Sequence, residues 1–146
     1  MNIFITLSEE PLYINPFVKK IIVALPYEIT GIGIQQGKTI VAGKGISDKI
    51  KYLITMAVIS DPLNLIRRAV LYTSFVFLEK IKIIGFKNPY SVAAVAEKYR
   101  IPIIYCHNVN SPDFIEILKQ KNVDVIINPA QAILRKDFLQ IPKVGG

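Results

Sequence analysis

The feature that most constrains the fold is an alternation between short apolar runs and stretches with helical spacing. Residues 2–7 form a short run of β-branched and aromatic residues, as expected for a buried parallel strand. Asn15-Pro16 supplies a cap and a first helical position, and apolar residues recur at helical spacing from there to Pro26. A second strand is predicted over 28–34. A strand, a helix and a strand in this order predict a βαβ unit with a right-handed crossover.

The same rhythm returns in the second half of the chain. Ser91 caps a predicted helix that ends near Tyr99, and the strand that follows covers 101–106. A helix over 112–121 opens with a Ser-Pro-Asp sequence, and the next strand covers 124–127. We therefore predict an α/β fold with a mostly parallel, Rossmann-like sheet and helices on both of its faces.

Between these two parts the pattern changes. Residues 35–45 are rich in glycine and lysine and are predicted to form a loop. Two helical patterns follow, one capped by Ser47 and one that starts at Asp61-Pro62. The apolar side of the second pattern consists of Leu63, Ile66, Val70, Thr73, Phe77 and Ile81. We predict a helical hairpin over 46–81, inserted into a single domain that covers 1–146.

The positive charge of the chain is concentrated around this hairpin. The whole chain has a formal charge of +7, and residues 38–87 contain nine basic and three acidic residues, a net of +6. Three interpretations remain open: the hairpin covers its own domain, it lies on an anionic membrane or a lipid-linked substrate, or it binds nucleic acid. Its longest uncharged run, 52–60, is too short to span a bilayer, which needs about 18 to 20 residues.

Cysteine and histidine are too scarce for several classes of site. With one cysteine and one histidine, the chain has neither an internal disulfide framework nor the ligand set of an ordinary zinc site. The first residues, MNIFITL, lack the basic region of a signal peptide, so we expect a cytoplasmic protein. Cys106 and His107 adjoin at a strand end, where neighbouring side chains point to opposite faces, so we expect a core cysteine and a loop histidine.

The sequence partly matches two phosphate-binding motifs, but it satisfies neither of them. A P-loop needs four residues between its first glycine and Gly-Lys-Thr, whereas Gly33 provides three and Gly31 provides five. A dinucleotide fingerprint would place glycines after the first strand, where this chain has Ser8-Glu9-Glu10. Two acidic residues at that turn would repel a phosphate. We therefore expect the glycine-rich stretch to be a strand that continues into a loop.

Four segments in the last third of the chain occur in a recognisable order. They are NSPDF (110–114), NVDVII (122–127), ILRKDFL (133–139) and IPKVG (141–145). This order resembles the N-terminal domain of the folate-dependent formyltransferases, which include methionyl-tRNA formyltransferase, glycinamide ribonucleotide formyltransferase and the sugar N-formyltransferases. The resemblance covers residues 91–146 and is weaker over 1–34.

The resemblance implies formyl transfer from 10-formyltetrahydrofolate to a primary amine. In the family an Asn-x-His motif and a catalytic aspartate follow the Leu-Gly turn, so they would lie beyond Gly146 and this chain alone would have no catalytic residue. It would retain part of the folate pocket, made by Gln131, Ala132, Ile133 and Leu134. The alternative that Ile133 and Leu134 only pack against a strand end stays open. The sequence departs from the family at 128–130, where Asn-Pro-Ala replaces small apolar residues, and at Arg100, where a helix-ending glycine is common.

The resemblance also bears on partners. The expected formyl acceptor is a small-molecule amine, in particular an amino sugar on a nucleotide or lipid carrier. Transfer RNA is disfavoured, because an apolar hairpin replaces the basic loop that contacts the acceptor arm in the family. An open strand edge would favour a homodimer of the isolated chain. A function of another class is a non-enzymatic interaction module, attached to a membrane or a partner through the hairpin over 46–81.

Overall fold

The structure, a computed structural model, describes residues 1–10, 13–36, 62–80, 88–129 and 133–144. The chain divides into two units, one formed by Met1–Gly37 with Lys87–Gly146 and the other by Lys38–Phe86. The elements of the first unit are, in chain order, β1 (Ile3–Leu7), α1 (Ile14–Ala24), β2 (Ile29–Gln35), α4 (Val92–Lys98), β3 (Ile103–Cys106), α5 (Pro112–Gln120), β4 (Val125–Ile127) and α6 (Lys136–Leu139).

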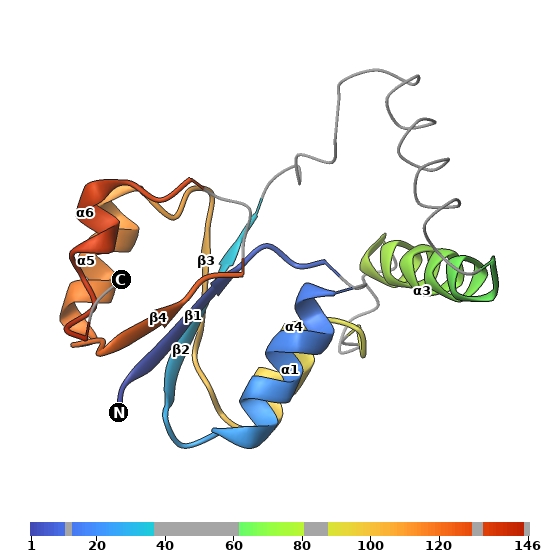
Figure 1. Cartoon of the computed structure of the whole chain (residues 1–146), viewed down its shortest axis with the longest axis horizontal. Coiled ribbons are helices and arrows are strands. Elements are labelled where there is room, and N and C mark those ends of the chain that lie inside the picture. Colours follow the sequence, from blue (N-terminus) through green and yellow to red (C-terminus); the bar gives the residue numbers. More distant parts are fainter. Residues whose placement is uncertain (11–12, 37–61, 81–87, 130–132, 145–146) are drawn as a thin grey trace. The chain divides into compact units, whose positions relative to one another are not determined.

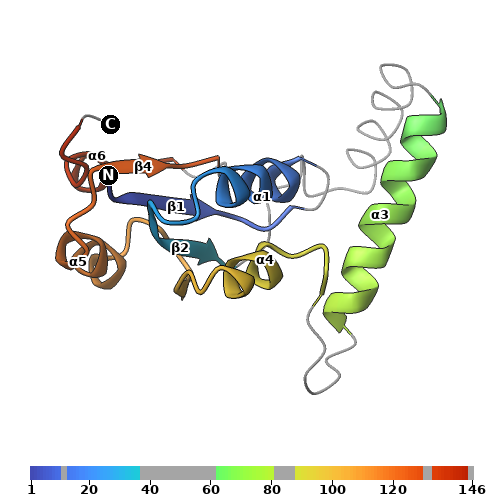
Figure 2. The same ribbon diagram turned by 90° about the horizontal axis from the view of Figure 1, so that it is seen from below.

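The four strands form one sheet in the order β3-β2-β1-β4, and every pair is parallel. β1 therefore lies inside the sheet, between β4 and β2 (Figure 2). All five of its residues are buried, as expected for a strand covered on both faces. Helices α1 and α4 lie on one side of the sheet, and α5 and α6 lie on the other (Figure 1). The predicted α/β, Rossmann-like fold is confirmed.

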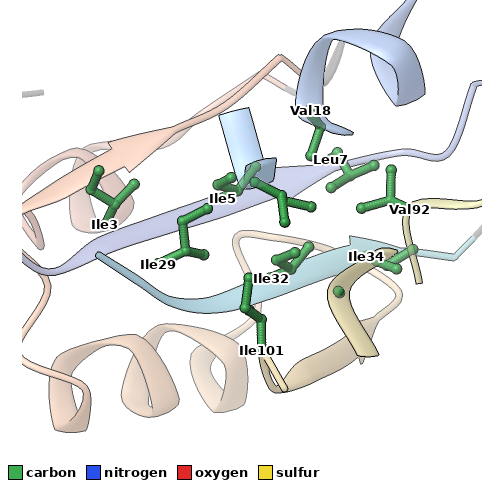
Figure 3. Close-up of a cluster of buried hydrophobic side chains, with 11 residues drawn as sticks. Ile3, Ile5, Leu7, Val18, Ile29, Ile32, Ile34, Val92 and Ile101 are labelled. Carbon is green, nitrogen blue, oxygen red and sulfur yellow. The ribbon is translucent and has the colours of Figure 1, made fainter. Parts of the chain in front are cut away.

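The first face of the sheet carries an aliphatic core. Alternate residues of β1, namely Ile3, Ile5 and Leu7, pack with Ile32 and Ile34 of β2 against the two helices (Figure 3). The members contributed by α1, α4 and the residue before β3 are Val18, Ile22, Val92, Ala96 and Ile101. This packing uses the period of two of the strand and the helical spacing of α1, which are the patterns that predicted these elements.

The second face is built around two aromatic rings. Phe4 of β1 and Phe114 of α5 pack edge to face, with ring centroids 6.1 Å apart. Gly31 and Gly33 of β2 lie directly beneath these rings. A Cβ added to Gly31 would lie 2.6 Å from the Phe4 ring, and one added to Gly33 would lie 2.5 Å from the Phe114 ring. The glycines thus provide the space that the two phenylalanines fill.

This packing explains why the stretch that partly matches a P-loop motif contains glycine at residues 31 and 33. Gly31 and Gly33 are interior residues of β2, paired with Phe4 and Thr6 of β1. A strand interior cannot wrap around a phosphate, so these two glycines act in packing, as the prediction of a strand implies. The rest of the motif, from Gly37 on, lies outside the described residues.

Two helices of the first unit end in left-handed residues. Arg100, after α4, has φ of 57°, and Asn122, after α5, has φ of 52°. The backbone N–H of Ile101 then donates to the carbonyl of Ala96, which closes the last turn of α4. Glycine is the usual residue in this conformation and asparagine tolerates it, but arginine pays a steric cost. Arg100 thus adopts a conformation in which glycine is the usual residue.

The described part of the second unit is α3 (Pro62–Lys80), one continuous helix (Figure 2). It starts at the predicted proline, but its predicted apolar side is largely exposed, whereas Phe75 is buried. The first helix of the predicted hairpin lies outside the described residues, so the insertion over 46–81 stays a prediction. Within the described residues, no helix is both long and apolar enough to cross a membrane.

Candidate functional site

The sheet has a switch point at the carboxyl ends of β1 and β4. From β1 the chain continues through α1 on one face to β2, whereas it reaches β4 from β3 through α5 on the opposite face. The connections therefore diverge between these two strands (Figure 1). In open α/β sheets, ligands bind in the crevice that such a divergence leaves. The carboxyl edge between β1 and β4 is therefore the candidate site.

A buried hydrogen bond joins the two strands at this point. The hydroxyl of Thr6, which is fully buried in β1, donates to Oδ1 of Asn128 over 2.9 Å. Asn128 directly follows β4 and is half-buried. Its amide nitrogen makes no hydrogen bond to the described part of the chain. Asn128 can therefore donate to a carbonyl or ring-nitrogen acceptor of a ligand at this edge.

A second asparagine holds the loop that follows β4. Nδ2 of Asn110 donates to the carbonyl of Ile133 over 2.8 Å, and its Oδ1 accepts from the backbone N–H of Arg135 over 2.8 Å. The backbone N–H of Asn110 donates to Oδ1 of Asn108, which shapes the turn before α5. The loops after β3 and β4 are thus linked side by side at the carboxyl edge.

The four residues predicted to bind the folate differ in whether the structure describes them and in how far they are buried. Gln131 and Ala132 lie outside the described residues. Ile133 is 88% exposed, and its side chain is available to a ligand. Leu134 is partly buried and packs against the core that contains Phe4 and Phe114. The packing of the Leu134 side chain agrees with the packing alternative for that residue, and the binding role of the loop over 131–134 stays a prediction.

The two glutamates in the turn after β1 accept hydrogen bonds from backbone N–H groups at the starts of two helices. Oε2 of Glu10 accepts from the backbone N–H groups of Tyr13 and Ile14, over 2.7 and 3.2 Å, at the start of α1. Oε1 of Glu9 accepts from the backbone N–H of Val92 at the start of α4 over 2.7 Å. These are the donors that bind phosphate in dinucleotide-binding folds. These N–H groups at the starts of α1 and α4 are therefore already occupied by carboxylates of the chain itself.

This capping also corrects a detail of the sequence interpretation. Asn15 was expected to cap α1, but the helix starts at Ile14 and the cap is the carboxylate of Glu10. The side chain of Asn15 is buried instead. It accepts from the backbone N–H of Glu10 and donates to the carbonyl of Tyr90, so it ties α1 to the segment before α4.

Cys106 and His107 end β3 and do not form a catalytic pair. Cys106 is partly buried and packs against the core on the α5 side. Burial raises the pKa of its thiol, which keeps the weakly nucleophilic protonated form at neutral pH. His107 is exposed, and its backbone carbonyl accepts from Nε2 of Gln35 over 3.2 Å. Both residues have the structural roles that their positions predicted.

We also searched the described residues for a metal centre and for a hollow away from this edge. Across the described ranges, no group of three or more His, Cys, Asp or Glu side chains could hold a metal ion. A hollow of about 390 Å³ lies between the ends of α5 and α6. Its walls, which include Lys119, Asn122 and Lys143, lie at the end of α5 and before β4, away from the switch point. No fully buried polar group lines this hollow.

Comparison with known proteins provides no family for the chain. A scan against protein-family models finds no match, and a search of curated proteins finds none either.

Proposed function

We propose that this chain forms the donor-binding part of a folate-dependent formyltransferase-type enzyme, whose reaction transfers a formyl group from 10-formyltetrahydrofolate to a primary amine such as an amino sugar. The observation that supports this proposal is the linkage of the loop after β4 to the switch point by Asn110. The resemblance places the pterin pocket in this loop, at 131–134. A polar pteridine ring needs hydrogen-bonding backbone groups and amides, and this edge provides both.

The chemistry at the edge suits a neutral heterocycle better than a phosphate. Asn128 contributes an amide nitrogen to the edge, and Asn110 positions the loop, whereas the carboxylates of Glu9 and Glu10 occupy two helix ends. A pteridine is recognised by paired donors and acceptors, and a phosphate requires free N–H groups or cations. The proposal therefore selects a folate over a nucleotide cofactor.

The proposal assigns binding, and no catalysis, to these 146 residues. The sequence contains no Asn-x-His motif, and its only histidine, His107, is exposed at the end of β3. After α6 the backbone N–H groups of Lys143 and Val144 donate to the carbonyls of Val123 and Asp124, just before β4. The free thiol of Cys106 agrees with a reducing compartment such as the cytoplasm.

The proposal is tested by measuring whether the full chain binds the stable analogue 5-formyltetrahydrofolate. Calorimetry gives the affinity, and changes in the backbone amide chemical shifts in NMR spectra show which residues are affected. We expect the shifts to centre on the turn at Asn110 and on the loop after β4. Asn110→Ala removes both hydrogen bonds to the loop, so it should weaken binding about tenfold. Gln120→Ala, which removes an exposed amide at the far end of α5, should leave binding unchanged.

Adenosine monophosphate serves as the control ligand, and we expect no binding because the helix ends are capped internally. A folded chain that shows no shifts with millimolar analogue would contradict the proposal. Equal weakening by Asn110→Ala and Gln120→Ala would also contradict it, because the loss would then not depend on the loop.

A further inference from the structure

The helix α3 presents large apolar side chains along one side. Leu63, Ile66, Val70 and Phe77 are between 61% and 78% exposed. Their spacing of three, four and seven residues places them on the same face of the helix, which we call the α3 stripe. Phe75, which lies on a different side of the helix, is buried. An apolar stripe of this size next to solvent indicates an interaction surface.

The charge around the stripe shows which kind of partner fits. Arg67 is exposed and directly follows the stripe residue Ile66, so it lies at the border of the stripe on the helix surface. The segment 38–87 contains nine basic and three acidic residues. A second copy of the helix would bring these like charges together, which disfavours self-association. Nucleic acid would use the charge but would leave the apolar stripe exposed to water.

We propose that α3 lies flat on an anionic lipid surface, with the α3 stripe in the interface and Arg67 at the lipid headgroups. The stripe provides the apolar contact and the net charge of +6 over 38–87 provides the attraction, as in other interfacial helices. This surface binding is independent of the proposed formyl transfer.

The absence of tryptophan from the chain allows a direct test. Phe77→Trp places a single fluorescent reporter in the stripe, and Tyr72→Trp places one on another side of the same helix, at a residue that is 49% exposed. Vesicles of phosphatidylcholine with phosphatidylglycerol should shift the emission of Phe77→Trp to the blue and that of Tyr72→Trp much less. Vesicles of phosphatidylcholine alone should shift neither.

Co-sedimentation with the same vesicles separates the apolar and the charged contributions. Ile66→Gln combined with Val70→Gln should reduce the bound fraction, whereas Ala69→Gln, an exposed residue off the stripe, should not. Arg67→Glu should weaken binding at least about fivefold at low salt. Lys20→Glu, the same charge reversal on the exposed side of α1, should have little effect. Circular dichroism spectra of each variant check that it is folded.

Three results would overturn the proposal. A blue-shifted emission of Phe77→Trp before lipid is added would mean that the chain itself covers the stripe. A shift produced by duplex RNA but not by anionic vesicles would identify nucleic acid as the partner. A sedimentation coefficient that rises with protein concentration and falls in Ile66→Gln/Val70→Gln would identify a second copy of the chain.

Discussion

The ring of Phe114 occupies the space that a side chain at residue 33 would need. A Cβ on Gly33 would lie 2.5 Å from Cζ of Phe114 and 3.2 Å from Cε1 of Phe4. Real Cβ contacts are essentially never as short as the first distance. The two glycines of β2 and the two rings above them are therefore one packing unit, shared by the central strands and α5.

Replacement of Gly33 by alanine should destabilise the fold because a ring must move within a closely packed core. We expect the free energy of unfolding to fall by about 1 to 3 kcal/mol, measured by urea denaturation. Phe114→Leu in the same background removes the clash, so the two changes together should cost less than their sum, by at least about 0.5 kcal/mol. Additive costs would show that the ring does not cause the effect.

Replacement of Arg100 by glycine should stabilise the chain. The left-handed conformation at φ of 57° is unfavourable for arginine and allowed for glycine, so the free energy of unfolding should rise by about 1 kcal/mol. Asn122→Gly is the matched control at φ of 52°, and its gain should be a few tenths of a kcal/mol because asparagine tolerates this conformation. An equal gain in both variants would argue against strain at Arg100.

Replacement of Thr6 by valine tests the link between β1 and β4. It removes the hydrogen bond to Asn128 and should cost about 1 kcal/mol of stability. Thr30→Val removes a comparable hydrogen bond to the carbonyl of Ile3, away from the switch point, and should cost a similar amount. Only Thr6→Val should also weaken binding of 5-formyltetrahydrofolate in calorimetry. If both variants weakened it equally, Asn128 would have no specific role in the site.

The pH dependence of alkylation at Cys106 should follow the burial of its thiol. Burial raises the pKa in the folded chain, so the protonated thiol stabilises the fold below the pKa of the unfolded chain. This contribution is lost as the pH rises through the pKa of the folded chain. Because the chain has one cysteine, the rate of reaction with iodoacetamide reports it alone. The midpoint should be higher in the native chain than in urea, and a lower native midpoint would contradict the assignment.

The strands and helices of the first unit could be predicted from local patterns because each element buries a face that its own periodicity defines. The run over 2–7 became the central strand β1, and Ser91 caps α4 through the backbone N–H of Ala94 as predicted. The site was less predictable. Thr6 and Asn128 are 122 residues apart, and no local signal in either segment indicates that they meet. The roles of Glu9 and Glu10 as helix caps likewise depend on where the helices start.

The sequence by itself determined the α/β alternation and the concentration of positive charge at 38–87, because both follow from residue order alone. The tertiary structure decided which residues share the carboxyl edge, why β2 contains Gly31 and Gly33, and which side of α3 is exposed. These features depend on the order of the strands and on contacts between segments distant in the chain. Periodicity identifies an apolar face of a helix, but only the packed structure shows whether another part of the protein covers it.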